Sequence, residues 1–157
     1  MIAQVNRMSI RDLLWHPVAR FSFRFLGYLL LLWTVYQLYL AWTHAHGELD
    51  FITYKVSELS HALATNLGVA NCEFSCFIDG CYVGREGKMV NVLEGCNGLK
   101  LAIVYAAYLL AVNGFTNKLV PQLILGMITI QLVNVIRIGV LVALRDMGGD
   151  TYFFFIK

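Results

Sequence analysis

The chain has 157 residues, of which 59% are hydrophobic and 14% are charged, and its mean hydropathy is +0.65. A composition this apolar excludes an ordinary soluble domain and predicts an integral membrane protein. The net charge of +2 is too small for a nucleic-acid-binding protein, and the sequence has no basic stripe interleaved with aromatic residues, so we expect no nucleic-acid partner.

Three apolar segments are predicted to span a membrane. The first, residues 25–42, has aromatic residues at both ends, which suits the two membrane interfaces. The second, residues 96–113, is close to the lower limit of roughly 17 residues for a perpendicular helix. The third, residues 119–144, is interrupted by a single charged residue, Arg137.

Basic residues orient these segments. The positive-inside rule places residues 1–24 in the cytoplasm, because four arginines precede the first span. Residues 43–95 and 145–157 then lie outside, the loop 114–118 lies inside, and both Cys96 and Arg137 emerge on the outer side. The four arginines are Arg7, Arg11, Arg20 and Arg24.

The outer segment contains two predicted elements. Apolar residues recur at helical spacing over residues 51–68, which predicts an amphipathic helix. That helix either lies on the outer membrane surface or packs on the other spans. Residues 77–93 combine short apolar runs with a glycine-rich turn, and they predict a β-hairpin that leads directly into Gly95 and Cys96.

The predicted fold is an all-α integral membrane protein that forms one domain over residues 1–157. It is a multi-pass helical bundle with three spans, an extracytoplasmic amphipathic helix and a short β-hairpin. Residues 152–157 are rich in phenylalanine and resemble the approach to another apolar span, so we expect a fourth span to be missing from this chain.

A cysteine stands at the predicted start of the second span. Gly95 and Gly98 allow a tight turn before the helix, whose first backbone N–H groups have no partners within it. Those N–H groups and the helix dipole would stabilise a Cys96 thiolate or the oxyanion of a tetrahedral intermediate. Arg137 would add fixed positive charge. The alternative is structural: Cys96 is then a small buried residue, and Arg137 is an interface anchor.

Two short motifs resemble the exosortase/archaeosortase family, and in particular its short members associated with Bacteroidetes. Cys96-Asn97-Gly98 matches the family's C-[SN]-G pattern before a helix. The run from Asn134 to Ile138 matches the pattern N-x-x-R-[IL] at the end of the following helix. The outer hairpin is also typical of the family, and the likeness covers residues 75–145.

The resemblance implies a membrane-embedded cysteine protease or transpeptidase. Such an enzyme cleaves C-terminal sorting signals, each made of a short motif, a membrane helix and a basic tail, on secreted proteins. Cys96 would be the nucleophile and Arg137 its electrostatic partner, with Asn97, Gly98 and Asn134 in support. The implied partners are those secreted proteins and membrane lipid, with no cofactor or metal. The implied location is the bacterial cytoplasmic membrane, with the active site outside.

The family's third residue, a histidine that follows the arginine, has no counterpart here. Residues 138–157 contain no histidine, so we expect the chain to stop short of it. Without a base, a thiolate would depend on the arginine and the helix end alone, so the sequence also allows an inactive chain. The substitute bases are His16 on the predicted inner side and His44, His46 and His61 outside, where interfacial roles are more typical.

Three further cysteines, Cys72, Cys76 and Cys81, lie in the outer segment, where a disulfide, free thiols or a zinc site remain open. Two other function classes also remain. One is a redox membrane protein in which Cys96 exchanges disulfides with these cysteines. The other is a non-enzymatic membrane subunit that packs its spans through small residues such as Gly126 and Gly139.

Overall fold

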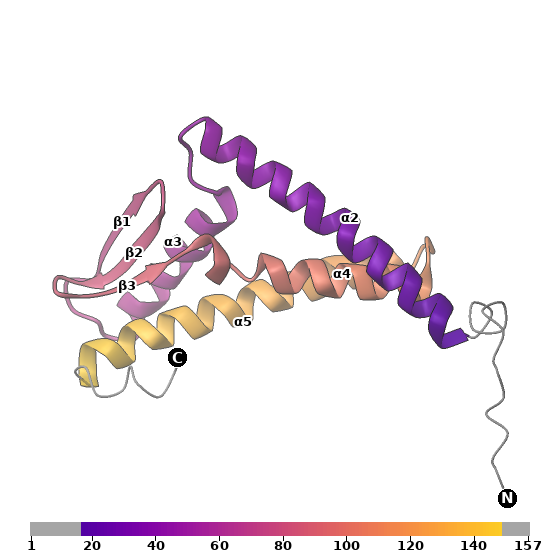
Figure 1. Ribbon diagram of the computed structural model, residues 1–157. Helices are drawn as coiled ribbons and strands as arrows, with labels where there is room; N and C mark the ends of the chain where they lie inside the picture. Colours follow the sequence, from indigo (N-terminus) through magenta and orange to yellow (C-terminus); the bar gives the residue numbers. More distant parts are fainter. Residues whose placement is uncertain (1–16, 149–157) are drawn as a thin grey trace, which may run out of the picture.

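The computed structural model describes residues 17–148, which form four α-helices, a three-stranded sheet and one 3-10 turn (Figure 1). In chain order these are α2 (Pro17–Ala45), α3 (Phe51–Asn66), β1 (Glu73–Phe77), β2 (Gly80–Arg85), β3 (Lys88–Val92), η1 (Glu94–Cys96), α4 (Leu99–Asn113) and α5 (Leu119–Gly148).

Two helices are long and apolar enough to cross a membrane, namely α2 with 29 residues and α5 with 30. The expected bundle of three spans is therefore wrong. The intermediate helix α4 has only 15 residues, below the roughly 17 that a span needs. It is short because the backbone at residues 96–98 is not α-helical. Cys96 is the last residue of the 3-10 turn, and Gly98 is left-handed, with φ 74°.

The fold is also not all-α, because a complete antiparallel sheet of order β1-β2-β3 replaces the expected hairpin. The predicted hairpin began at residue 77, whereas β1 begins at Glu73 and residues 78 and 79 form the turn between β1 and β2. β1 pairs with β2 from Glu73 opposite Gly84 to Phe77 opposite Gly80. Most of β1 was not predicted, because β1 is a short strand whose side chains are at best half-buried.

The sheet, α3 and the second half of α5 (residues 134–148) pack together, and we call this part the head. Figure 1 shows α3 between the sheet and α5. The helix expected over residues 51–68 is α3, and of its two possible positions it takes the packed one. The core of the head consists of small and β-branched residues: Val56, Ala64, Val69, Val83, Val90, Val92, Val135, Ile138, Val142 and Ala143.

The rest of the described chain, which we call the arm, contains α2, α4 and the first half of α5 (residues 119–133). In α2 only Tyr36 and Thr43 are buried, although the helix is rich in leucine. The outward-facing leucines of the arm include Leu30, 66% exposed, and Leu125, 69% exposed. Apolar surface on this scale is typical of helices that face lipid or another protein.

Candidate functional site

The segment around Cys96 lies where the arm meets the head. The Cys96 backbone N–H donates to the Leu93 carbonyl at 2.8 Å and closes the 3-10 turn. The Cys96 carbonyl accepts a hydrogen bond of 2.8 Å from the side-chain amide of Asn134 on α5. The thiol itself is exposed and free. The backbone at Cys96 is thus tied to α5, while its sulfur stays accessible.

The next two residues shape the entry into α4. Asn97 is fully buried, and its Oδ1 accepts a hydrogen bond of 2.9 Å from the N–H of Leu99, the first residue of α4. Gly98 takes the left-handed conformation that favours glycine. A Cβ at Gly98 would lie 3.4 Å from the Asn134 side chain, so this turn and α5 are in close contact.

A buried carboxylate, which the sequence analysis did not single out, holds this turn from the other side. Asp50 is fully buried, and its oxygens accept hydrogen bonds from Asn97 Nδ2 at 2.7 Å and from the Tyr39 hydroxyl at 2.8 Å. As the N-cap of α3, it also accepts from the N–H groups of Ile52 and Thr53. Its position directly before an amphipathic helix was a signal for the cap, but nothing local indicated the bonds to α2 and to Asn97.

Cys96 and Arg137 line one pocket of about 270 Å³. Lys100, which the sequence analysis did not single out either, lines it too. Among residues 17–148 no carboxylate lines this pocket, and no hydrogen bond or ion pair ties Lys100 or Arg137 to another described residue. The lining residues are Gly95, Cys96, Gly98, Lys100, Leu101, Ile130, Val133, Asn134 and Arg137.

This arrangement places a nucleophile and two cations in one cavity at the N-terminus of α4. The helix dipole adds partial positive charge there. An accessible thiol in an electropositive setting is suited to thiolate chemistry, and the cations can hold an anionic intermediate. Of the five residues expected at the site, four line the pocket, namely Cys96, Gly98, Asn134 and Arg137, whereas Asn97 is buried behind it and bonded to Asp50. Their chemical roles remain predictions.

The described histidines lie elsewhere. His44 Nε2 lies 2.8 Å from Glu94 Oε1, and both residues line a neighbouring cavity that shares only Gly95 with the Cys96 pocket. His46 is bonded to the Trp42 carbonyl and His61 to the Cys72 carbonyl. His16 lies outside the described residues.

Two of the outer cysteines are joined, because Cys76 and Cys81 form a disulfide across the turn between β1 and β2. Cys72 is free and half-buried, and burial raises the pKa of its thiol. No group of three or more potential metal-ligating side chains occurs in the part of the chain that the structure describes. Of the three possibilities left open by the sequence, the structure thus shows one disulfide and one free thiol.

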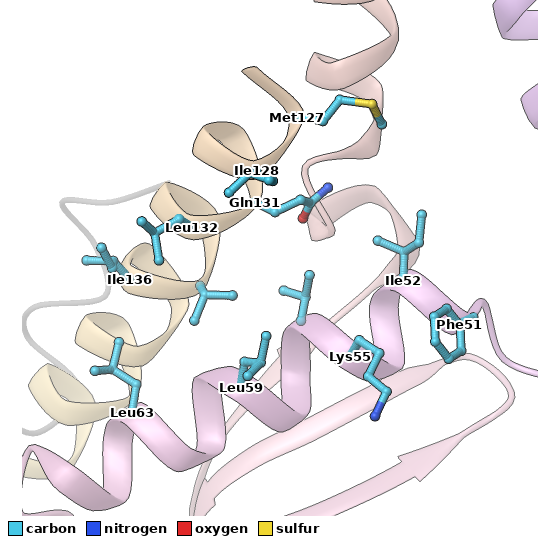
Figure 2. Close-up of a pocket in the computed structure, with 12 residues that line it drawn as sticks. Phe51, Ile52, Lys55, Leu59, Leu63, Met127, Ile128, Gln131, Leu132 and Ile136 are labelled. Atoms are coloured by element: carbon cyan, nitrogen blue, oxygen red, sulfur yellow. The ribbon is translucent and has the colours of Figure 1, made fainter. Parts of the chain in front are cut away.

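A larger cavity, of about 740 Å³, lies between α3 and α5 (Figure 2). Figure 2 shows Leu59 and Leu63 of α3 opposite Leu132 and Ile136 of α5, while the Lys55 ammonium points away from the groove. The lining is apolar apart from Lys55 and Gln131 and contains no nucleophile. The reactive side chains are therefore in the smaller pocket.

Comparison with known proteins gives no match of any kind: no protein-family model, no curated protein and no solved structure is similar to this chain. The resemblance to exosortases therefore depends on the two motifs alone.

Proposed function

We propose that this chain is a membrane-embedded cysteine enzyme that cleaves C-terminal sorting signals of secreted proteins and transfers the acyl group to an acceptor. The observation that carries the proposal is the pocket that Cys96 shares with Arg137. The two motifs behind the family resemblance lie far apart in the sequence, and both contribute residues to this one cavity.

The chemistry follows from these residues. The Cys96 thiolate attacks the carbonyl carbon of the peptide bond and forms an acyl-enzyme. Arg137 stabilises the oxyanion with its planar, permanently charged guanidinium. Asn134 donates to the Cys96 carbonyl, and Asn97 accepts from the Leu99 N–H at the start of α4, so both are positioning residues.

We further propose that the site lies at the outer face of a bacterial cytoplasmic membrane, with α2 crossing from the inside. The disulfide between Cys76 and Cys81 supports an oxidising compartment for the head. Arg137 comes 18 residues after Leu119, the first residue of α5 (137 − 119 = 18). At about 1.5 Å per residue this is roughly 27 Å, close to the thickness of the hydrocarbon core.

Contacts with α2 support the same placement for the hairpin of α4 and α5. At one end, Glu94 pairs with His44, the penultimate residue of α2. At the other end, the ring of Phe115 in the loop between the helices contacts Tyr28, with ring centroids 6.5 Å apart. The hairpin therefore extends beside the apolar part of α2. In this placement the chain returns to the inner level through the 3-10 turn η1 together with α4, because α4 alone is too short for a regular span.

The alternative functions have weaker support. No second cysteine lines the Cys96 pocket in the described chain, so disulfide exchange lacks a partner there. A packing subunit would use Gly126 and Gly139 for close contacts with another chain. Here both glycines contact side chains of the same chain. A Cβ at Gly126 would overlap the Tyr105 ring, and one at Gly139 would come within 2.7 Å of the Leu63 side chain.

The function is tested with a secreted reporter fused to C-terminal sorting signals taken from the genome that encodes this chain. Wild type should cleave at least one fusion, and Cys96→Ala should cleave none. Cys96→Ser should lose at least about 100-fold, because a serine needs a base. Arg137→Lys should lose at least about tenfold, because lysine lacks the planar fork.

The matched controls are Cys72→Ser, which removes the other free thiol, and Arg85→Lys, which changes an exposed arginine of β2. Both should cleave like wild type. Cleavage by Cys96→Ala, or the absence of cleavage by wild type across the fusions, would overturn the proposed function.

The orientation has a separate test in a chain with Cys72→Ser and Cys96→Ser. In intact cells, a membrane-impermeant maleimide should label a cysteine at Asn66 in the head and should spare one at Asn117 in the hairpin loop. Labelling of Asn117→Cys from outside would contradict the orientation.

A further inference from the structure

The Cys96 pocket contains a second cation, Lys100, next to the nucleophile. Lys100 lines the pocket together with Cys96 and Arg137. A Cβ placed on Gly95 would lie 3.4 Å from the Lys100 Nζ, so the ammonium lies over the residue that precedes Cys96. A substrate carbonyl bound to the Cys96 sulfur would therefore have this ammonium close by.

The position of this lysine is electrostatically unfavourable for the fold. Lys100 is the second residue of α4, where the helix dipole disfavours a cation, and α4 has no acidic residue in its first turn. No described carboxylate lies within ion-pair distance of Lys100, and Arg137 lines the same cavity. Such a departure from the local rule makes Lys100 a candidate functional residue.

The pocket offers few groups that could move a proton. The Arg137 guanidinium does not release its proton in proteins. The described histidines are bonded outside the cavity, His44 to Glu94, His46 to a carbonyl of α2 and His61 to a carbonyl of the head. Apart from the Cys96 thiol, Lys100 is the one described lining residue that can both donate and accept a proton.

We propose that Lys100 is the general acid and base of this pocket, an inference that rests on the acyl-transfer function proposed above. Cys96 first loses its proton to water, and the thiolate forms a C–S bond to the substrate carbonyl carbon. When the C–N bond breaks, its electron pair goes to nitrogen, and the Lys100 ammonium gives that nitrogen a proton. The amine fragment leaves neutral, and Lys100 is left as a free amine.

The second half of the reaction restores both groups. The acceptor, an amine or water, attacks the thioester carbon and gives a proton to the Lys100 amine. The C–S bond breaks and its electron pair returns to Cys96 as the thiolate. Lys100 thus lends one proton and recovers one in each cycle, and no oxidant or reductant is needed.

The test compares two synthetic substrates that share the sequence around the bond cut by wild type, one with an amide at that bond and one with a thioester. A thiolate leaving group needs no proton, whereas an amine does. Lys100→Arg keeps the positive charge but cannot transfer the proton. It should slow cleavage of the amide by about 100-fold or more, within the usual range for general acid catalysis. Both rates are read as release of the leaving fragment in the first turnover, before the deacylation step in which Lys100 acts as a base. On this measure Lys100→Arg should change release of the thiol fragment from the thioester less than about fivefold.

Lys118→Arg, at the opposite end of the hairpin, is the matched control and should cleave both substrates like wild type. The rate of Cys96 alkylation by iodoacetamide reports whether Lys100→Arg still folds around an open pocket. Amide cleavage at the wild-type rate in Lys100→Arg would overturn the proposal, as would equal losses on both substrates. Cys96→Ala should lose both activities in every case. If wild type cleaves neither substrate, the proposed function itself fails and this inference fails with it.

Discussion

The head and the arm both contain many apolar residues but use them in opposite ways. In the head, Val83 and Val142 are almost fully buried among α3, the sheet and the second half of α5. In the arm, leucines such as Leu30 and Leu125 face outward. The same helix, α5, belongs to both parts, and the change from one environment to the other falls near Asn134 and Arg137. The candidate site lies at this change.

The difference teaches why the site is where it is. A charged, reactive pocket needs water and positioned donors, which lipid-facing helices do not supply. The head provides the rigid partners, since Asp50 and Asn134 hold the turn on both sides of Cys96. The arm provides an exposed apolar surface, and under the proposed function this is the surface that the apolar helix of a substrate contacts. The following substitutions test this division, beginning with the largest expected effect.

Asp50→Ala should destabilise the protein by about 3 kcal/mol or more, because it removes the carboxylate that accepts hydrogen bonds from Asn97, Tyr39 and Thr53. Chemical unfolding in detergent, followed by circular dichroism, measures the loss. Asp79→Ala, at an exposed turn between β1 and β2, is the control and should stay within about 0.5 kcal/mol of wild type. Equal effects of the two substitutions would show that Asp50 does not join the arm to the head.

Glycine-to-alanine substitutions should have opposite effects in the two parts. Gly84 has φ +142°, and a Cβ there would lie 2.7 Å from the Lys88 carbonyl oxygen, so Gly84→Ala should cost about 3 kcal/mol. Gly27 in α2 has no neighbour within 4 Å of the added carbon, and Gly27→Ala should stabilise its helix by up to about 1 kcal/mol. The same unfolding measurement tests both substitutions. A loss of stability in Gly27→Ala would mean that α2 packs more tightly against its neighbours than the structure indicates.

Two truncations of apolar side chains, one in the head and one in the arm, form a matched pair. Val83→Ala should cost about 2 kcal/mol, because the residue is fully buried and a cavity remains. Leu125→Ala removes a larger group from a side chain that is 69% exposed. It should cost less than about 0.5 kcal/mol in detergent. A larger loss at Leu125 would indicate that this face of α5 is covered by another protein.

The smallest effect concerns Cys72, which reports on water exclusion from the head. Burial raises the pKa of its thiol, so in a Cys96→Ser chain its alkylation rate should still rise with pH above the ordinary value of 9.0. Fewer thiolates form at a given pH when the pKa is higher, so the reaction should also be slow at pH 8. The same chain unfolded in guanidinium chloride should titrate at the ordinary value. Identical pH profiles of Cys72 alkylation in the folded and the unfolded chain would contradict the exclusion of solvent from the head.

The sequence predicted the periodic elements better than the contacts between them. The helix over residues 51–68 was recognised from its apolar spacing and is α3, because periodicity is a local signal. The second predicted span, residues 96–113, failed for a local reason that hydropathy does not show, the left-handed turn at Gly98 before α4. β1 was largely missed because a short, half-exposed strand becomes visible only through its pairing with β2.

The candidate site divides in the same way. Cys96, Asn97 and Gly98 attracted attention as a motif, and Arg137 as an isolated charge in an apolar segment. Asp50 was missed as a partner of Asn97, since those residues are 47 positions apart and meet only in the folded chain. Lys100 was missed because one lysine beside a helix start looks like an ordinary interface residue until the cavity shows what lies around it.

The central claim is that Cys96 becomes acylated, and a trapped intermediate tests it most directly. The purified full chain is mixed with a reporter fusion that it cleaves, quenched in acid and examined by intact-protein and peptide mass spectrometry. The account predicts an added mass equal to the acyl fragment of the reporter, on the peptide that contains Cys96, released by hydroxylamine as a thioester is. An adduct on another residue, or cleavage that proceeds equally in Cys96→Ala, would contradict it.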